Sequence, residues 1–299
     1  MTKIHVLAGG NYSEREVSLR SGAAVTAALQ KAGYDDVTLL DPATTSIDDI
    51  AACDVVFPAL HGTGGEDGTL QAQLEERGVA FVGSGSAASA LCFDKWRYRE
   101  FVEAYELPMA AGALVQADNY QTHTLASGPY VLKPLEGGSS IDTYIVRDPA
   151  HAAHAQIAET FHRHPTMLME QLIIGTELTV GVLEQRALPV IEIIPPADGE
   201  FDYENKYNGA TQELCPPIHV SSQVQQAAQA LALRVHQETG CRDFSRTDIM
   251  CDAAGHLYLL ETNTLPGMTD QSLFPKMAAA EGLDMSALCT KLVTLALTR

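Results

Sequence analysis

The sequence predicts an α/β domain followed by an α+β unit, and three patterns carry this prediction. Short apolar runs alternate with amphipathic stretches over the first third of the chain, which is typical of a parallel sheet with helices on both faces. After about Leu91, apolar runs alternate with polar turns instead. Near the C-terminus, a strand-turn-strand pattern carries charged and amide side chains. A chain of 299 residues with 46% hydrophobic residues can bury one sizeable core or two to three smaller ones.

The N-terminal elements place two polar loops at one edge of the predicted parallel sheet. Strands are expected at 4–8, 37–40 and 55–60, with an amphipathic helix at about 17–32. Pro58 argues against a central position for the third strand. Ligands gather at the carboxyl ends of parallel strands, where the loops 9–14 and 61–68 are expected. The first loop lacks GxGxxG spacing, which disfavours a dinucleotide site, and its charged residues also fit a simple helix start.

The second unit is expected to begin with a helix from Lys95 to Tyr105 and to continue as strands. Those strands are predicted at 130–134, 143–146, 167–172 and 178–183. Lys133 closes the first of them, and the paired glycines and serines at 137–140 would let the backbone approach an anion. The order of a Walker A loop is absent, and a Gly-Gly-Ser-Ser run is also common in ordinary turns.

The predicted hairpin near the C-terminus has the composition of a metal site. If its turn is centred at 254–255, Asp248 lies opposite Glu261 and Arg246 lies opposite Asn263, all on one face. Two carboxylates about 5 Å apart repel each other unless a positive charge lies between them. Three oxygen donors without His or Cys favour a hard cation such as Mg²⁺ or Mn²⁺. The alternative is a solvated face on which the arginine shares the charges.

Two further segments have the composition of parts of an active site. The stretch 195–217 is polar and poor in regular pattern, and loops of this length often act as lids. It contains more aromatic residues than a disordered linker usually does, although a linker is the alternative. In the stretch 264–273, Gly267 could direct a backbone N–H at an oxyanion and Ser272 could reach a carboxylate. Taken alone, this stretch also reads as a loop before a helix.

Composition excludes several classes of protein. The formal net charge of −19 argues against a general binder of nucleic acid or of anionic membranes. The six cysteines include no CxxC pair, which favours buried thiols in a reducing compartment over disulfides or zinc. The histidines at 151, 154, 162 and 164 lie on an Ala-rich helical pattern, which favours a solvated helix over a metal site. No apolar run approaches the ~20 residues of a spanning helix, so a soluble cytoplasmic protein is expected.

Several motifs occur in a fixed order along the chain. They are Gly9-Gly10 with 13–18, 59–62 with 65–68, Lys133-Pro134 with 138–140, Lys206-Tyr207, Arg246 with Asp248, and 261–264 with 266–269. In this order they resemble the motifs of the D-alanine–D-alanine ligases of the ATP-grasp superfamily, along nearly the whole chain. Each motif alone is weakly specific, and the ordered set is highly specific. The resemblance implies a Rossmann-like N-terminal domain at 1–91, a central ATP-grasp lobe at 92–176 and a C-terminal lobe with metal site and lid at 177–299.

The resemblance also implies a reaction and its nucleotide site. A carboxylate is a poor electrophile, so ATP would convert one D-alanine to an acyl phosphate before the amine of the second attacks. Lys95 and Lys133 would contact the phosphates, Glu170 would face the adenine and Glu177 the ribose hydroxyls. Asp248, Glu261 and Asn263 would hold two Mg²⁺ or Mn²⁺ ions that neutralise the transferring group. A homodimer is also implied.

The resemblance assigns substrate roles as well. Glu14 would take the ammonium of the first D-alanine, linked through Ser139 to Tyr207 on the lid. His61 would lie near the same substrate. Arg246 and the Gly267 N–H would steady the tetrahedral oxyanion, while Lys206 and Ser272 would hold the second carboxylate, with Leu273 also in the substrate site.

The chain departs from the family's pattern near the glycine-rich loop. Asp142 stands where relatives usually have glycine, Glu136-Gly137 replaces a more usual pair, and the region 116–129 is shorter than in many relatives. A carboxylate beside ATP phosphates is unfavourable unless it points away from them. The departures therefore bear on ATP binding rather than on ligation.

The resemblance implies synthesis of the D-alanyl-D-alanine dipeptide of peptidoglycan, and three other functions are alternatives. Members of the family that form an ester tend to lack the tyrosine that matches Tyr207, so the resemblance implies D-alanine rather than D-lactate as second substrate. The first alternative is a related ligase that takes D-serine, D-lactate or another amino acid as second substrate. A nucleotide-binding regulator without turnover would be expected to lose Arg246 or Ser272, and both are present. Topology alone also allows a dinucleotide-dependent oxidoreductase, which tight binding of NAD would support.

Overall fold

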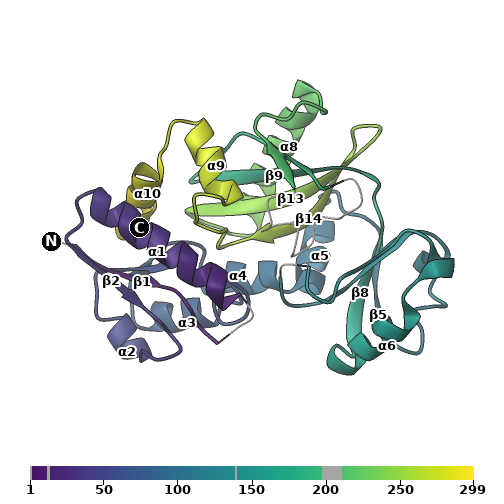
Figure 1. Cartoon of the computed structure of the whole chain (residues 1–299), viewed down its shortest axis with the longest axis horizontal. Coiled ribbons are helices and arrows are strands. Elements are labelled where there is room, and N and C mark those ends of the chain that lie inside the picture. The colour runs from purple at the N-terminus through teal and green to yellow at the C-terminus, as the bar shows by residue number, and fades with distance from the viewer. Residues whose placement is uncertain (1, 12–13, 139, 197–210) are drawn as a thin grey trace.

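Three sheets follow one another along the long axis of the molecule (Figure 1). The computed structural model describes residues 2–11, 14–138, 140–196 and 211–299. A four-stranded parallel sheet lies at one end, a six-stranded antiparallel sheet in the middle and a four-stranded antiparallel sheet at the other end. The predicted change from α/β to α+β organisation is therefore confirmed.

The N-terminal sheet has the strand order β2-β1-β3-β4. Its elements are β1 (Lys3–Leu7), α1 (Arg15–Lys31), β2 (Asp36–Leu40), α2 (Ile47–Ile50), β3 (Val55–Pro58), α3 (Thr69–Glu76) and β4 (Ala80–Phe81). Pro58 argued against a central position for the third strand, but β3 lies between β1 and β4. Pro58 is the last residue of β3, where a missing N–H interrupts little of the ladder. The loops after β1 and β3 leave the sheet at one edge, as expected for parallel strands.

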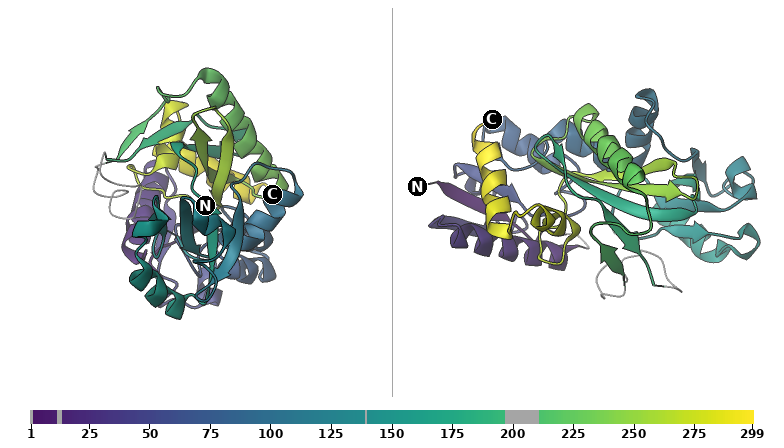
Figure 2. Two further views of the ribbon diagram at one scale, coloured as in Figure 1. Left: turned by 90° about the vertical axis from the view of Figure 1, so that its right-hand side faces the viewer. Right: turned by 90° about the horizontal axis from the view of Figure 1, so that it is seen from above.

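The central sheet has the order β12-β11-β9-β13-β14, with β10 paired to β9. Its strands are β9 (Gly175–Leu183), β10 (Arg186–Ala187), β11 (Ile191–Ile194), β12 (Gln212–Leu214), β13 (Phe244–Asp252) and β14 (Leu257–Asn263). Helix α8 (Ser222–Glu238) covers one face of this sheet, as Figure 2 shows. Ala228, Ala232 and Val235 recur at helical spacing and pack, fully buried, on Leu178 and Val180 of β9.

The third sheet has the order β5-β8-β6-β7. Its strands are β5 (Gly112–Gln116), β6 (Tyr130–Pro134), β7 (Tyr144–Val146) and β8 (Thr166–Gln171), and α6 (His154–Arg163) packs on it. Helices α4 (Ser86–Phe93) and α5 (Lys95–Ala104) join it to the N-terminal sheet, and short 3₁₀ turns lie at Thr124–Ser127 and Pro149–His151. The predicted helix at 95–105 is confirmed as α5, and the predicted strands at 130–134, 143–146 and 167–172 are confirmed as β6, β7 and β8 within one residue at each end. The predicted strand at 178–183 is β9, which belongs to the central sheet and begins three residues earlier.

The register predicted for the hairpin holds where the charged residues lie. Arg246 pairs with Asn263 and Asp248 with Glu261. Beyond a bulge after Asp248 the register shifts, so that Ile249 pairs with Leu259. The turn is therefore displaced from the predicted centre, and the extra residue of β14 in the bulge restores the predicted pairing.

The C-terminal helices complete the N-terminal half of the molecule. Helix α10 (Met285–Leu297) lies beside α1, and α9 (Leu273–Ala280) packs against α10 and β9. Both ends of the chain lie at the same end of the molecule (Figures 1 and 2). One apolar cluster joins Ile4 and Phe57 of the parallel sheet to Phe244, Phe274 and Leu292. The first and last segments of the chain thus share one core.

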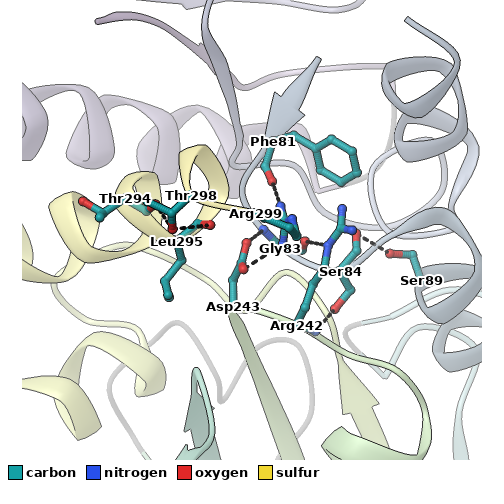
Figure 3. A network of polar contacts seen from close by, with 10 residues as sticks. All are labelled: Phe81, Gly83, Ser84, Ser89, Arg242, Asp243, Thr294, Leu295, Thr298 and Arg299. Atoms are coloured by element: carbon teal, nitrogen blue, oxygen red, sulfur yellow. Dashed lines mark hydrogen bonds and ion pairs between the residues drawn. The ribbon is translucent and has the colours of Figure 1, made fainter. Parts of the chain in front are cut away.

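A buried carboxylate ties this core together at the start of β13 (Figure 3). The Asp243 side chain is 5% exposed and accepts hydrogen bonds from the Gly83 N–H and from Nη1 of Arg299, each at 2.8 Å. Arg299 also donates to the Phe81 carbonyl at 2.7 Å. Arg242 donates to the Gly83 carbonyl at 2.9 Å and lies over the Phe81 ring. The end of β4, the start of β13 and the C-terminal arginine are therefore held in one polar network.

Replacing Arg299 by alanine is expected to lower the free energy of unfolding by about 2 kcal/mol. The substitution leaves the buried carboxylate of Asp243 without its cation, whereas burial already raises the pKa of that group. Urea denaturation followed by circular dichroism measures the change. The matched control is Lys291→Ala, because its ion pair with Glu184 is half exposed and is worth about 0.5 kcal/mol at most. Equal losses in the two variants would contradict a structural role for Arg299.

Candidate active site

Two cavities meet at the hairpin and the glycine-rich loop. The first, of about 310 Å³, lies between the two antiparallel sheets, and the second, of about 660 Å³, lies between the N-terminal and C-terminal segments. Both volumes are typical of sites for small molecules. Glu261 and Gly138 line both cavities. A group bound in one cavity can therefore reach a group bound in the other.

The structure distributes the predicted site residues between these two cavities. The first cavity is lined by Lys95, Lys133, Glu170, Glu177, Asp248 and Glu261. The second is lined by Glu14, His61, Arg246, Glu261, Asn263, Gly267, Ser272 and Leu273. The predicted residues Ser139, Lys206 and Tyr207 lie outside the described residues. All the other predicted residues thus line one cavity or both.

Two lysines make the first cavity suitable for an anion. Lys133 forms an ion pair with Glu170 at 2.5 Å, and the Lys95 ammonium donates to the Gly137 carbonyl at 2.6 Å. Burial lowers the pKa of Lys95, and the neighbouring Lys133 adds to this effect although Glu261 opposes it. A polyphosphate in the cavity would supply the negative charge that this pair of ammonium groups favours.

Apolar side chains form other walls of the first cavity. Ile141, Ile145 and Ile174 line it and are 44%, 38% and 61% exposed, although large apolar residues are usually buried. Met250 and Leu259 line it from the hairpin. A flat ring bound between these side chains would cover apolar surface that is now open to water. Lysines with apolar walls fit a molecule that has a ring system and phosphates.

The hairpin places two carboxylates and an arginine where the cavities meet. Arg246 binds Asp248 through two hydrogen bonds, of 3.0 Å from Nε and 2.9 Å from Nη2. The charge of Asp248 raises the pKa of Arg246 despite burial, with further help from Glu261. The hydroxyl of Thr179 donates to Oδ1 of Asp248 at 2.6 Å. Asp248 is only 7% exposed, which argues against a merely solvated charged face.

The donors on this face have the chemistry of a site for a hard cation. Asp248 and Glu261 face each other across the strand pair, and Asn263 lies two residues further along β14. The Oδ1 atom of Asn263 accepts the Leu265 N–H at 2.9 Å, which fixes its orientation. Carboxylate and amide oxygens without thiolate or imidazole suit Mg²⁺ or Mn²⁺. The residues present therefore fit a divalent metal ion.

The second cavity contains an acid that the sequence analysis did not assign to the site. Glu66 lines this cavity, and its Oε2 atom accepts the Gly62 N–H at 2.6 Å. Burial and the nearby Glu14 raise the pKa of Glu66 to about 8. Burial, together with Arg246, also lowers the pKa of His61 to about 4, so its imidazole is neutral near pH 7. The position of Glu66 in the loop after a parallel strand is the signal that could have identified it.

The segment after the hairpin brings backbone and hydroxyl groups to the second cavity. Gly267 has no room for a side chain, because an added Cβ would lie 2.8 Å from Oγ of Ser272. The Ser272 hydroxyl accepts the Thr269 N–H at 3.1 Å at the start of α9. Arg20 and Lys276 also line this cavity and were not predicted, since a basic residue on an amphipathic helix carries no distinctive signal. The cavity thus offers cations and hydrogen-bond donors to a carboxylate.

The departure at Asp142 is accommodated away from the first cavity. Its carboxylate binds Arg163 at 2.7 Å and His164 at 3.0 Å, at the C-terminal end of α6. Burial opposes ionisation, but these hydrogen bonds hold the pKa of Asp142 below its usual range. Asp142 also has a left-handed backbone with φ of 56°, which aspartate tolerates better than most residues. The predicted conflict with a bound phosphate is therefore avoided.

We expect Asp142→Ala to raise the KM for a nucleotide about fivefold and to leave kcat nearly unchanged. The variant loses a half-exposed ion pair worth up to ~1 kcal/mol and places alanine in a left-handed conformation. Asp142→Asn is the control, because asparagine tolerates this conformation and can still accept a hydrogen bond from Arg163. Steady-state kinetics with varied ATP measures both constants. A fall in kcat with constant KM would contradict a role of the Asp142 contacts in nucleotide binding.

The helix predicted for the histidine-rich segment is confirmed for His154 and His162, which lie in α6, whereas His151 lies in a 3₁₀ turn and His164 directly follows the helix. His154 contacts the Tyr120 hydroxyl at 3.0 Å, and His164 contacts Asp142. Within the described ranges no group of three His, Cys, Asp or Glu side chains is arranged to hold a metal ion. The same part of the chain contains no helix long and apolar enough to cross a membrane.

The two antiparallel sheets with a cavity between them, and the acidic hairpin at its mouth, define the ATP-grasp class of ligases. Comparisons with known proteins agree. The family described as D-ala D-ala ligase C-terminus matches residues 105–294, and D-ala D-ala ligase N-terminus matches residues 39–84. The D-alanine–D-alanine ligase of Aromatoleum aromaticum is 43% identical over 96% of this chain and 93% of that protein. That of Gluconobacter oxydans is 41% identical over 99% of this chain and 100% of that protein.

Solved structures of D-alanine–D-alanine ligases also match this chain over its whole length. The D-alanine–D-alanine ligase of Bacillus anthracis superposes with a TM-score of 0.86 at 30% identity, over 100% of this chain and 98% of that one. The same enzyme in complex with ATP superposes with a TM-score of 0.85 at 27% identity, with the same coverage. The chain belongs to the D-alanine–D-alanine ligase family, and the resemblance found from the sequence motifs is confirmed.

Proposed function

We propose that this chain joins two D-alanine molecules to D-alanyl-D-alanine with hydrolysis of ATP, for peptidoglycan precursor synthesis. The observation that carries the proposal is the meeting of the two cavities at Glu261 and Gly138. Phosphoryl transfer to a carboxylate requires the terminal phosphate and the carboxylate to be in contact. A nucleotide in the first cavity and an amino acid in the second meet that requirement.

On the nucleotide side, the residues of the first cavity have distinct roles in this proposal. Lys95 and Lys133 bind the phosphates of ATP, Glu170 faces the adenine, and Glu177 faces the ribose hydroxyls. The Lys95 ammonium lies beside the glycine-rich loop, since it donates to the Gly137 carbonyl, and Lys133 lines the same cavity. The apolar walls then cover the base.

Asp248, Glu261 and Asn263 would hold two Mg²⁺ or Mn²⁺ ions in this proposal. Divalent ions held there would neutralise negative charge on the phosphate group that is transferred. Arg246 now neutralises Asp248 through its two hydrogen bonds. Arg246 is therefore positioned next to Asp248, where it could also bind a substrate oxygen.

On the substrate side, Glu14 takes the ammonium of the first D-alanine, and His61 lies near it. Arg246 and the Gly267 N–H bind the oxyanion of the tetrahedral intermediate. Ser272, with Leu273 and Lys206, holds the carboxylate of the second D-alanine. Ser139 and Tyr207 complete the proposed set, although these two and Lys206 lie outside the described residues.

Three further features belong to the proposal. We infer functional units at 1–91, 92–176 and 177–299, a homodimer and a cytoplasmic location. The retention of Arg246 and Ser272 in the second cavity supports an enzyme with turnover rather than a nucleotide-binding regulator. The family assignment also argues against a dinucleotide-dependent oxidoreductase.

The test is ADP release by the purified protein with ATP and Mg²⁺. The reaction is run without added substrate, with D-alanine, L-alanine, D-serine or D-lactate alone, and with D-alanine together with D-serine or D-lactate, and the products are identified by mass. Release that requires D-alanine and yields its dipeptide supports the proposal. A mixed product formed only with D-serine or D-lactate would favour the related ligase instead. ATP binding without release in any mixture would contradict ligation.

A further inference from the structure

Arg99 lies buried behind the first cavity and joins its walls. It is 1% exposed and lies on α5, one turn after Lys95. Its Nη1 atom binds Glu103 at 2.7 Å, while its Nη2 atom donates to the Ala110 carbonyl and binds Oε1 of Glu170 at 3.0 Å. One guanidinium thus links the helix that carries Lys95 to the strand that carries Glu170.

The neighbouring backbone leaves space for this guanidinium. Gly112 of β5 pairs directly with Glu170 of β8. A Cβ atom added to Gly112 would lie 2.5 Å from the guanidinium carbon of Arg99. A larger residue would therefore displace the arginine, and the same close packing leaves the arginine little room to move.

One carboxylate oxygen of Glu170 has a buried partner, and the other has a partner that lines the cavity. Oε1 is bound by the buried Arg99, and Oε2 is bound by Lys133, which is 12% exposed and lines the cavity. If Lys133 turns towards phosphates, as the proposed function requires, the contact with Arg99 remains. Glu170 then keeps a cationic partner on one oxygen while the other becomes free towards the cavity.

We propose that Arg99 is a positioning residue that fixes Glu170 for the selection of adenine over guanine. This inference rests on the proposed role of the first cavity as the ATP site. A fixed carboxylate oxygen accepts a hydrogen bond from the exocyclic amine of adenine. The carbonyl oxygen that guanine has at this position offers no proton and is repelled by the carboxylate. Without Arg99, the Glu170 carboxylate would move together with Lys133, and the selection of adenine over guanine would be lost.

Calorimetric titration with ATP or GTP, each with Mg²⁺ and without D-alanine, tests this role. The wild-type protein is expected to bind ATP at least ~10-fold more tightly than GTP. Arg99→Met keeps the length of the side chain without its donors, and we expect the ratio to fall to within about threefold of unity. Arg99→Lys keeps the charge but loses the planar fork, so an intermediate ratio is expected.

Glu103→Gln is the matched control. It removes the other ionic partner of Arg99 at the outer end of the guanidinium, where the Glu103 side chain is 57% exposed. The ratio of ATP to GTP affinity is expected to stay at the wild-type value. Thermal unfolding of each variant without nucleotide separates a loss of stability from a loss of selection.

Two results would overturn the inference. One is a wild-type protein that does not distinguish the nucleotides. The other is a ratio of ATP to GTP affinity in the folded Arg99 variants that equals the wild-type ratio. Such a result would contradict the inference even if both nucleotides bound more weakly, because a merely structural role weakens the binding of ATP and GTP equally. If Arg99→Met does not fold, Arg99→Lys decides the question. Since binding is measured without D-alanine, failure to form the dipeptide would contradict the proposed function and leave this result standing.

Discussion

Replacing Arg246 by alanine is expected to lower kcat by about 10²- to 10³-fold, which is the usual cost of removing a donor to a developing oxyanion. Arg246 lines the second cavity and is held by two hydrogen bonds to Asp248, which lines the first, so its guanidinium is positioned before substrate binds. The variant also loses the two hydrogen bonds that Arg246 donates to the buried Asp248, and its unfolding temperature is expected to fall. Initial rates of ADP release at saturating ATP and D-alanine measure the effect on turnover.

Arg246→Lys and Arg234→Ala are the comparison variants for this experiment. Lysine keeps the charge but cannot form the two parallel hydrogen bonds, so an intermediate rate is expected. Arg234 is exposed on α8 and donates to the Tyr105 carbonyl at 2.9 Å, outside both cavities. Its alanine variant is expected to keep the wild-type kcat within about twofold. If Arg246→Ala also kept kcat within about twofold of the wild-type value, the proposed role of Arg246 in binding the oxyanion would be wrong.

The hairpin shows how far sequence reasoning can go and where it stops. Side-chain alternation and strand pairing are local rules, so the pairing of Asp248 with Glu261 could be predicted from residue order alone. The bulge in β14 could not, because it depends on how the strand pair twists against its neighbours. The prediction succeeded at the charged residues because the displaced turn and the bulge offset each other.

The groups behind the cavities were harder to predict than the groups that line them. Lys133 ends a strand before a glycine pair, a local signal that marks an anion site. Arg99 has no such signal, because its role depends on the space left by Gly112 in another strand. Glu66 has a weak signal, its position in the loop after a parallel strand, but its raised pKa depends on burial and on Glu14, which the fold brings near it. Spacing along the chain identifies residues that share an element, whereas these contacts join elements far apart in sequence.

Glu261→Gln is expected to lower kcat at least ~100-fold while the fold remains intact. Glutamine has the same shape as glutamate, and Glu261 keeps its position opposite Asp248 in the strand pair. The substitution removes one negative charge from a donor set that contains two carboxylates, so the affinity for a divalent ion falls. The rate of ADP release is measured over a range of Mg²⁺ concentrations, and bound Mn²⁺ is counted by electron paramagnetic resonance with nucleotide present.

Asp252→Asn, at the end of β13 in the same hairpin, is the matched control. Asp252 pairs with His256 at 3.0 Å and lines neither cavity, so its amide variant is expected to bind Mn²⁺ and turn over as the wild type does. Chelation of the metal should stop the wild-type reaction and leave the circular dichroism spectrum unchanged. If Glu261→Gln keeps both its Mg²⁺ dependence and its rate, the metal assignment of this hairpin is wrong. Loss of Mn²⁺ binding in Glu261→Gln alone would place the ion at the meeting point of the two cavities, because Glu261 lines both.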